Sequence, residues 1–291
     1  MLTSMDILFW THLLNGLLMV GMPIGLGIFL TRKFHLDWRL WWIGAATFVL
    51  SQLGHIPFNL LVSPLFNQYF FIALPVVWQR VINAVFLGLS AGFFEEFFRY
   101  GMYRWWAKDA RSWRKGLLAG AGHGGAEAII LGGITLYAFI QLATLRNADL
   151  SHLVPASQLA AAQQQVHSYW TMPWAASLLG ALERFFTIPI QVSFAVLVLQ
   201  TFTRKQWYWV WLAVLYHALI DATAVIVPAY IPGAWVEAFV AFYALVSVVL
   251  IFTLRQPEPP EAALPVSDPV SVMPLKPVEE TRENLDNTRF S

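Results

Sequence analysis

Seven long apolar segments occupy most of the first 255 residues of this chain. Each holds about the 20 residues that a helix needs to cross the hydrocarbon core of a bilayer. The chain is 58% hydrophobic and only 12% charged, whereas a soluble domain carries about 25% charged residues. We therefore predict an all-α, polytopic bundle of membrane-spanning helices. The predicted spans cover residues 5–30, 39–62, 78–103, 116–145, 171–202, 207–228 and 231–254.

The distribution of Lys and Arg predicts how this bundle is oriented. Cytoplasmic loops carry an excess of positive charge, and basic residues gather here in every second connection and after the last span. They are Arg32, Lys33 and Arg39, then Arg104, Lys108, Arg111, Arg114 and Lys115, then Arg204, Lys205 and Arg255. The pattern predicts an N-terminus outside and a C-terminus in the cytoplasm. We expect an integral protein of the bacterial inner membrane, in contact with membrane lipid.

Two segments outside the predicted spans have a different composition. The polar loop 146–170 is predicted to hold a short surface helix. Residues 256–291 carry seven acids and three bases and are rich in Pro, so they have little apolar surface to bury. We predict a membrane domain over 1–255 and a disordered cytoplasmic tail over 256–291.

Some chemistries are excluded by what the sequence contains. The chain has no cysteine, which rules out a disulfide framework and thiolate catalysis. The glycine-rich stretch 116–125 lacks the strand that precedes a phosphate-binding loop. Nothing in the sequence predicts nucleic-acid binding.

Acids and histidines inside the apolar segments are the candidates for function, because charged groups are costly at membrane depth. At 1.5 Å of rise per residue, most of them lie roughly 10–21 Å from the cytoplasmic ends of their helices. We expect four helices to bring them into one layer, on the cytoplasmic side of the midplane. Glu183 and Arg184 lie higher, and we expect them to pair with a neighbouring helix. The residues of the layer are Glu95, Glu96, His123, Glu127, Gln191, His217 and Asp221.

Residues four apart share one face of a helix. A carboxylate beside a histidine fixes its tautomer and raises its basicity. Two chemistries stay open. His123, His217 and Glu96 could supply three ligands of a catalytic zinc, or a glutamate alone could activate water as a general base. The pairs that share a face are Glu95 with Arg99, His123 with Glu127, and His217 with Asp221.

These motifs, taken in order over about residues 10–230, resemble those of a known family. They are Glu95-Glu96-Phe-Phe-Arg99-Tyr100, Gly122-His123-Gly-Gly-Ala-Glu127, Glu183-Arg184 and His217-Ala-Leu-Ile-Asp221. The set is similar to that of the CPBP (Abi) intramembrane proteases, which process CAAX proteins and bacteriocins, and more closely to their YhfC-like branch of membrane peptidases. The resemblance implies cleavage of a peptide bond in a protein or peptide within or beside the membrane.

The resemblance also implies roles for individual residues. Glu95, Glu96 and His123 would bind or activate the hydrolytic water. His217 and Asp221 would bind a metal ion, with Zn²⁺ as the candidate, or stabilise the oxyanion.

Two positions depart from the family pattern. Arg99 follows the glutamate pair one residue earlier than in the CAAX-processing branch, which disfavours a prenyl-protein substrate. Gln191 stands where related sequences have a histidine. A glutamine can donate to an oxyanion but is a poor zinc ligand, so a metal-free mechanism stays open beside a zinc one.

Two alternatives from other functional classes remain. Buried acids and histidines also form proton relays and ion sites in transporters. Transporters usually have internal repeats and broken helices. The sequence shows no repeat, although Pro189 could break the fifth span. The other alternative is a non-catalytic membrane scaffold descended from a protease.

Overall fold

The computed structural model describes residues 4–65, 68, 74–232 and 235–257. Seven of the described helices are long and apolar enough to cross a membrane, and no strand occurs in this part of the chain. The prediction of an all-α bundle with seven spans is confirmed. The helices are α1 (Ser4–Phe34), α2 (Arg39–Leu65), α3 (Val76–Gly101), α4 (Trp113–Leu145), α5 (Ala156–Thr171), α6 (Leu179–Thr203), α7 (Tyr208–Ile226) and α8 (Val236–Thr253).

The helix ends lie within five residues of the predicted spans, except before α6. The fifth span was expected to begin at residue 171, but α5 ends there and Pro173 follows. Proline has no backbone N–H to donate to the preceding turn, so α5 ends before it. A short 3-10 turn, Ala176–Leu178, then leads into α6. The helix predicted between 146 and 170 is α5. The predicted disordered tail lies outside the described residues from residue 258 on.

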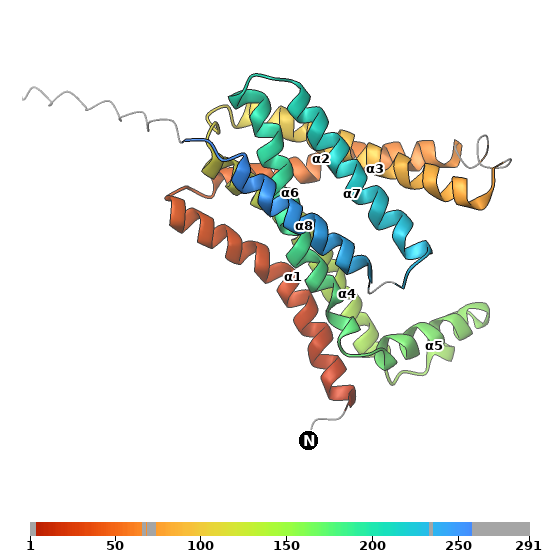
Figure 1. Cartoon of the computed structure of the whole chain (residues 1–291). Coiled ribbons are helices and arrows are strands. Elements are labelled where there is room, and N and C mark those ends of the chain that lie inside the picture. The colour runs from red at the N-terminus through yellow and green to blue at the C-terminus, as the bar shows by residue number, and fades with distance from the viewer. Residues whose placement is uncertain (1–3, 66–67, 69–73, 233–234, 258–291) are drawn as a thin grey trace, which may run out of the picture. The chain divides into compact units, whose positions relative to one another are not determined.

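α6 is the central helix of the bundle. Buried residues make up 72% of its apolar window, compared with at most 39% in any other candidate span. It packs against α1, α3, α4, α7 and α8 (Figure 1). In addition, α4 packs against both α1 and α2, and α3 packs against α7. Polar residues on α3, α4, α6 and α7 can therefore meet inside the protein.

Proline does not break the central helix. Pro189 lies inside α6, which is continuous from Leu179 to Thr203, so the break that this proline could have caused does not occur. Membrane helices tolerate proline because neighbouring helices and local adjustments satisfy the freed backbone groups. α1 also contains a proline, Pro23, and it changes direction midway along its length (Figure 1). Proline is the usual cause of such a bend.

Two glycines bring the backbones of α2 and α4 into direct contact. A Cβ atom added to Gly122 would lie 2.0 Å from the carbonyl oxygen of Trp41, and one added to Gly44 would lie 2.1 Å from that of Ala119. Small residues allow this approach between membrane helices. The contact fixes the depth and rotation of α4 next to α2, and so the place of His123.

We expect Gly122→Ala to lower the free energy of unfolding by at least about 3 kcal/mol. Overpacking usually costs about 1–3 kcal/mol, and the cost is at the upper end of this range when the backbone must move. The measurement is thermal or denaturant unfolding in detergent. Gly133→Ala is the matched control on the same helix, since a Cβ there meets nothing within 4 Å. Equal stability of the two variants would contradict the close contact.

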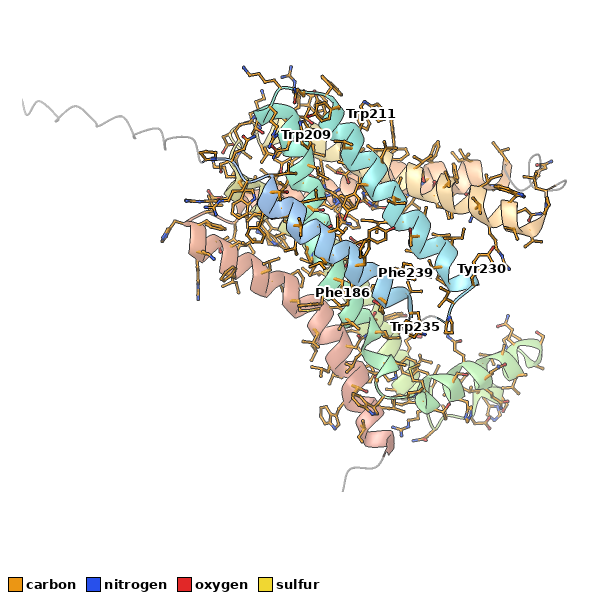
Figure 2. All side chains as sticks on the ribbon, in the orientation of Figure 1. Phe186, Trp209, Trp211, Tyr230, Trp235 and Phe239 are labelled. Carbon is orange, nitrogen blue, oxygen red and sulfur yellow. The ribbon has the colours of Figure 1, made fainter. Side chains whose placement is uncertain are left out.

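Aromatic residues lie at both ends of the α7–α8 pair. Figure 2 shows Trp209 and Trp211 near the beginning of α7, and Tyr230 and Trp235 near the connection to α8. Trp and Tyr favour the two interfaces of a bilayer, because their rings are apolar and their N–H and O–H groups are polar. This placement agrees with α7 crossing the membrane from one interface to the other.

Candidate active site

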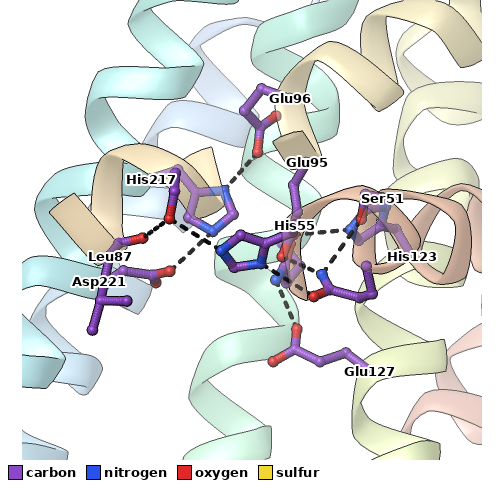
Figure 3. Close-up of polar contacts among 12 residues, drawn as sticks. Ser51, His55, Leu87, Glu95, Glu96, His123, Glu127, His217 and Asp221 are labelled. Atoms are coloured by element: carbon purple, nitrogen blue, oxygen red, sulfur yellow. Dashed lines mark hydrogen bonds and ion pairs between the residues drawn. The ribbon is translucent and has the colours of Figure 1, made fainter. Parts of the chain in front are cut away.

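Polar side chains from α2, α3, α4, α6 and α7 lie in one buried region (Figure 3). We use the name charged cluster for its centre, which consists of Glu95, Glu96, Arg99, His123, His217 and Asp221. Three of the spanning helices carry these residues: α3, α4 and α7. Polar residues of α2 and α6 contact the cluster from two sides. The acids and histidines that the sequence singled out therefore lie in one region of the protein.

Arg99 connects the parts of the cluster. Its side chain is fully buried, and it forms ion pairs with Glu95, at 3.5 Å, and with Glu96. It also donates a hydrogen bond to the amide oxygen of Gln191 on α6. A buried charge is tolerated only when it is paired and hydrogen-bonded, and the planar guanidinium can serve several acceptors at once. Arg99 thus holds the two glutamates at fixed positions.

Glu95 pairs with His123 across the α3–α4 interface. Its Oε2 lies 3.1 Å from Nε2 of His123, and its Oε1 accepts a hydrogen bond from Gln52 on α2 at 3.0 Å. The carboxylate therefore favours the tautomer with a proton on Nε2. Nδ1 of His123 is buried and has no hydrogen-bond partner among the described residues, which leaves it as an acceptor.

The predicted pair of His123 with Glu127 does not form. Glu127 instead accepts hydrogen bonds from Arg184, at 2.6 Å, and from Gln191, at 2.7 Å. A charge-assisted bond to an arginine is stronger than one to a neutral histidine. Glu127 therefore faces α6, and His123 turns to α3.

Glu96 pairs with His217 across the α3–α7 interface. Its Oε1 lies 2.7 Å from Nδ1 of His217 and also accepts from Arg99. On the other side of the ring, Nε2 lies 3.5 Å from Asp221, as the i,i+4 spacing predicted. Glu96 is fully buried, and its Oε2 has no partner among the described residues. Asp221 is the most accessible member of the cluster, with 39% of its side chain exposed.

Gln191 links the charged cluster to a second ion pair. Its oxygen accepts from Arg99 and its nitrogen donates to Glu127. Arg184 bridges Glu127 and Glu183, the latter at 2.5 Å, so its predicted pairing with a neighbouring helix is present. Gln191 therefore supports Arg99 through its oxygen, while the second N–H of its NH₂ group is not used by these two bonds.

A chain of polar residues from α2 was not placed in the site by the sequence. His55 contacts Ser90 on α3 at 3.2 Å. It contacts Gln52 at 3.2 Å and Asn59 at 2.8 Å, and Gln52 reaches Glu95. The signal was present, since residues 51, 55 and 59 are polar, lie four apart and share one helix face inside an apolar span.

The donor types of the cluster suit zinc, but their arrangement does not. Among the described residues, no three His, Asp or Glu side chains are grouped so that they could hold a metal ion. The predicted ligands His123, His217 and Glu96 are not brought together as a set, because His123 contacts Glu95 while His217 contacts Glu96. The positive charge next to both glutamates is that of Arg99.

Comparison with known proteins gives a family for this chain. Residues 18–250 match the family described as "YhfC intramembrane metalloprotease". A Bacillus subtilis (strain 168) protein, named "Uncharacterized membrane protein YhfC", is 31% identical over 252 residues, which are 84% of this chain and 95% of the relative. No solved structure matches. With seven apolar helices, the chain is an integral, multi-pass membrane protein. Since the family match covers most of its length, this protein belongs to the YhfC intramembrane metalloprotease family.

Proposed function

We propose that this protein is an intramembrane peptidase that uses a glutamate to activate water. One observation carries the proposal. Two adjacent buried glutamates each contact a histidine from a different helix, and one arginine contacts both glutamates. Such a costly set of buried ionisable groups marks a functional site in a membrane protein. The family description, "YhfC intramembrane metalloprotease", supports the peptidase activity but names a metal-dependent one.

Glu96 is the proposed general base. Its Oε1 is held by Arg99 and His217, whereas Oε2 is buried and without a partner among the described residues. A water that donates to Oε2 can lose its proton to Glu96 as it attacks the carbonyl carbon of the peptide. A base must lie within hydrogen-bond reach of the proton that it removes, and Oε2 is the oxygen of the pair that is free to do so.

His123 is the proposed proton carrier: its Nδ1 would take from Glu96 the proton that Glu96 removed from water, and would give it to the leaving amine. Glu95 orients its ring through Nε2, and Nδ1 is left as an acceptor. The arrangement is that of a histidine positioned by a carboxylate. His217 would stabilise the oxyanion. Its contact with Asp221 is 3.5 Å long, beyond an ordinary hydrogen bond, so a protonated Nε2 can turn to a nearer oxygen. Preorganised donors of this kind stabilise developing charge.

The proposed substrate is a protein or peptide segment in or next to the membrane, and it would enter laterally or from the cytoplasmic side. We place the protein in the bacterial inner membrane, with its N-terminus outside, on the distribution of Lys and Arg. The wider relation to the CPBP (Abi) proteases also belongs to this proposal and is supported by the order of the four motifs.

The first experiment asks whether cleavage needs a metal ion. We expect the purified protein in proteoliposomes to cleave a membrane peptide from a broad library. We also expect the rate to stay within about twofold after a strong chelator has been added and removed, because the charge beside Glu95 and Glu96 is supplied by Arg99. The readout is mass spectrometry of the peptide fragments.

Two results would count against parts of this proposal. Loss of activity that only added zinc restores would contradict the metal-free mechanism but leave the peptidase intact. No cleavage by the metal-replete protein would remove the peptidase and favour the scaffold or the transporter. The hydrogen-bonded chain from Asn59 through His55 and Gln52 to Glu95 would then be the candidate proton path.

A further inference from the structure

An apolar groove lies outside the charged cluster. It has a volume of about 950 Å³ and runs between α1 and α8, with residues of α4 and α6 also lining it. Phe186, one of its lining residues, lies between α1 and α8 in the view of Figure 2. From α6, Ile188 and Val192 line the groove, whereas Gln191 contacts Arg99. Phe29 and Leu245 in its walls are 53% and 65% exposed, so the groove is open at the surface.

Basic and aromatic residues form one end of this groove. Lys33 lines it, with Nζ 5.0 Å from the ring centre of Phe29 and 5.9 Å from that of Phe34. Phe34 contacts Trp113 edge to face at 6.2 Å, and the guanidinium of Arg255 lies 5.0 Å above Trp113. The described lining residues include no acid. An apolar groove with cations at one end is complementary to an amphiphile with a negative head.

The length of the groove distinguishes a lipid from a helix. It follows α1 from Met22 to Phe34 and α8 from Ala241 to Phe252, which at 1.5 Å per residue is about 16–18 Å. This length is close to half of the roughly 30 Å hydrocarbon core, that is, one leaflet. A helix that crosses the membrane needs about 20 residues, the full thickness of the core, and would extend well past this groove.

We propose that the groove binds one anionic phospholipid. Its acyl chains lie along α1 and α8, and its phosphate lies at Lys33 and Arg255. Lys33 lies in the last turn of α1 and Arg255 follows α8. The distribution of positive charge predicts that both helix ends are cytoplasmic, and the cytoplasmic leaflet is the one that holds anionic lipid. Basic pockets between membrane helices bind lipid head groups by this chemistry. The site is independent of peptidase activity, and so is its test.

The test compares phosphatidylglycerol with phosphatidylcholine of identical chains, each titrated onto the purified full-length protein in detergent and followed by native mass spectrometry. We expect phosphatidylglycerol to bind more tightly. A cation at a membrane surface contributes about 1 kcal/mol, so Lys33→Gln should weaken this binding about fivefold. Lys205→Gln removes an equal charge from a residue that does not line the groove, and it should leave binding unchanged.

A second pair of variants tests the groove itself. Gly25 lines it, and a Cβ there meets nothing within 4 Å, so Gly25→Leu should fill the groove without disturbing the fold. We expect loss of tight phospholipid binding. Gly133→Leu also enters open space, on α4 and away from the lining residues, and should bind as the wild type does. Equal binding of the two phospholipids, or equal effects within either pair of variants, would overturn the proposal.

Discussion

Glu96→Gln is expected to reduce the rate of peptide cleavage by about 10²–10⁴-fold, the usual contribution of a general base. The amide cannot take a proton from water. Its oxygen can still accept from Arg99 and His217, as Oε1 of Glu96 does, so the helix packing around residue 96 should persist. The measurement is the initial cleavage rate in proteoliposomes at equal amounts of folded protein.

The control for this variant is Glu237→Gln, which makes the same change on the spanning helix α8. Glu237 lies in the first turn of that helix and takes no part in the charged cluster as described. We expect its cleavage rate to stay near that of the wild type. A Glu96→Gln protein that cleaves at the wild-type rate would remove Glu96 as the base and leave Nδ1 of His123 as the remaining candidate.

Arg99→Met is expected to lower the free energy of unfolding by about 3–5 kcal/mol, the usual cost of removing one partner from a buried ion pair. The change leaves Glu95 and Glu96 buried beside each other without their cation. It also leaves the amide oxygen of Gln191 without its donor. Thermal or denaturant unfolding in detergent measures the loss.

Two companion variants separate charge from packing at this position. Adding Glu96→Gln to Arg99→Met should return part of the lost stability, because one of the two uncompensated acids is then neutral. Arg39→Met is the matched control. Arg39 is 62% exposed and lies 3.7 Å from Asp109, and surface pairs contribute little to stability. If Arg99→Met is no less stable than Arg39→Met, Arg99 does not hold the cluster together.

The sequence predicted the number of spans and the identity of most site residues for a local reason. Apolar length determines which segments can cross a bilayer, and a polar residue inside such a segment is conspicuous wherever the helix lies. Gln52 and His55 could have been found in the same way, because they are polar and lie inside the second span. Pro173 likewise predicts where α5 ends.

The pairing of these residues could not be read from the sequence. The i,i+4 rule gave Glu95 with Arg99 and His217 with Asp221 correctly, but it also gave His123 with Glu127, which is wrong. Spacing along one helix shows which residues share a face. It does not show which neighbouring helix that face meets, because this depends on the rotation and crossing of both helices.

The sequence by itself determined an all-α membrane bundle with acids and histidines inside its apolar segments, because hydrophobicity is a property of single segments. Only the tertiary structure decided that Arg99 contacts both glutamates and that each glutamate has its own histidine. The close approach of α2 and α4 at Gly44 and Gly122 contributes to this outcome. Contacts between helices depend on backbone packing across the whole bundle, which no single segment contains.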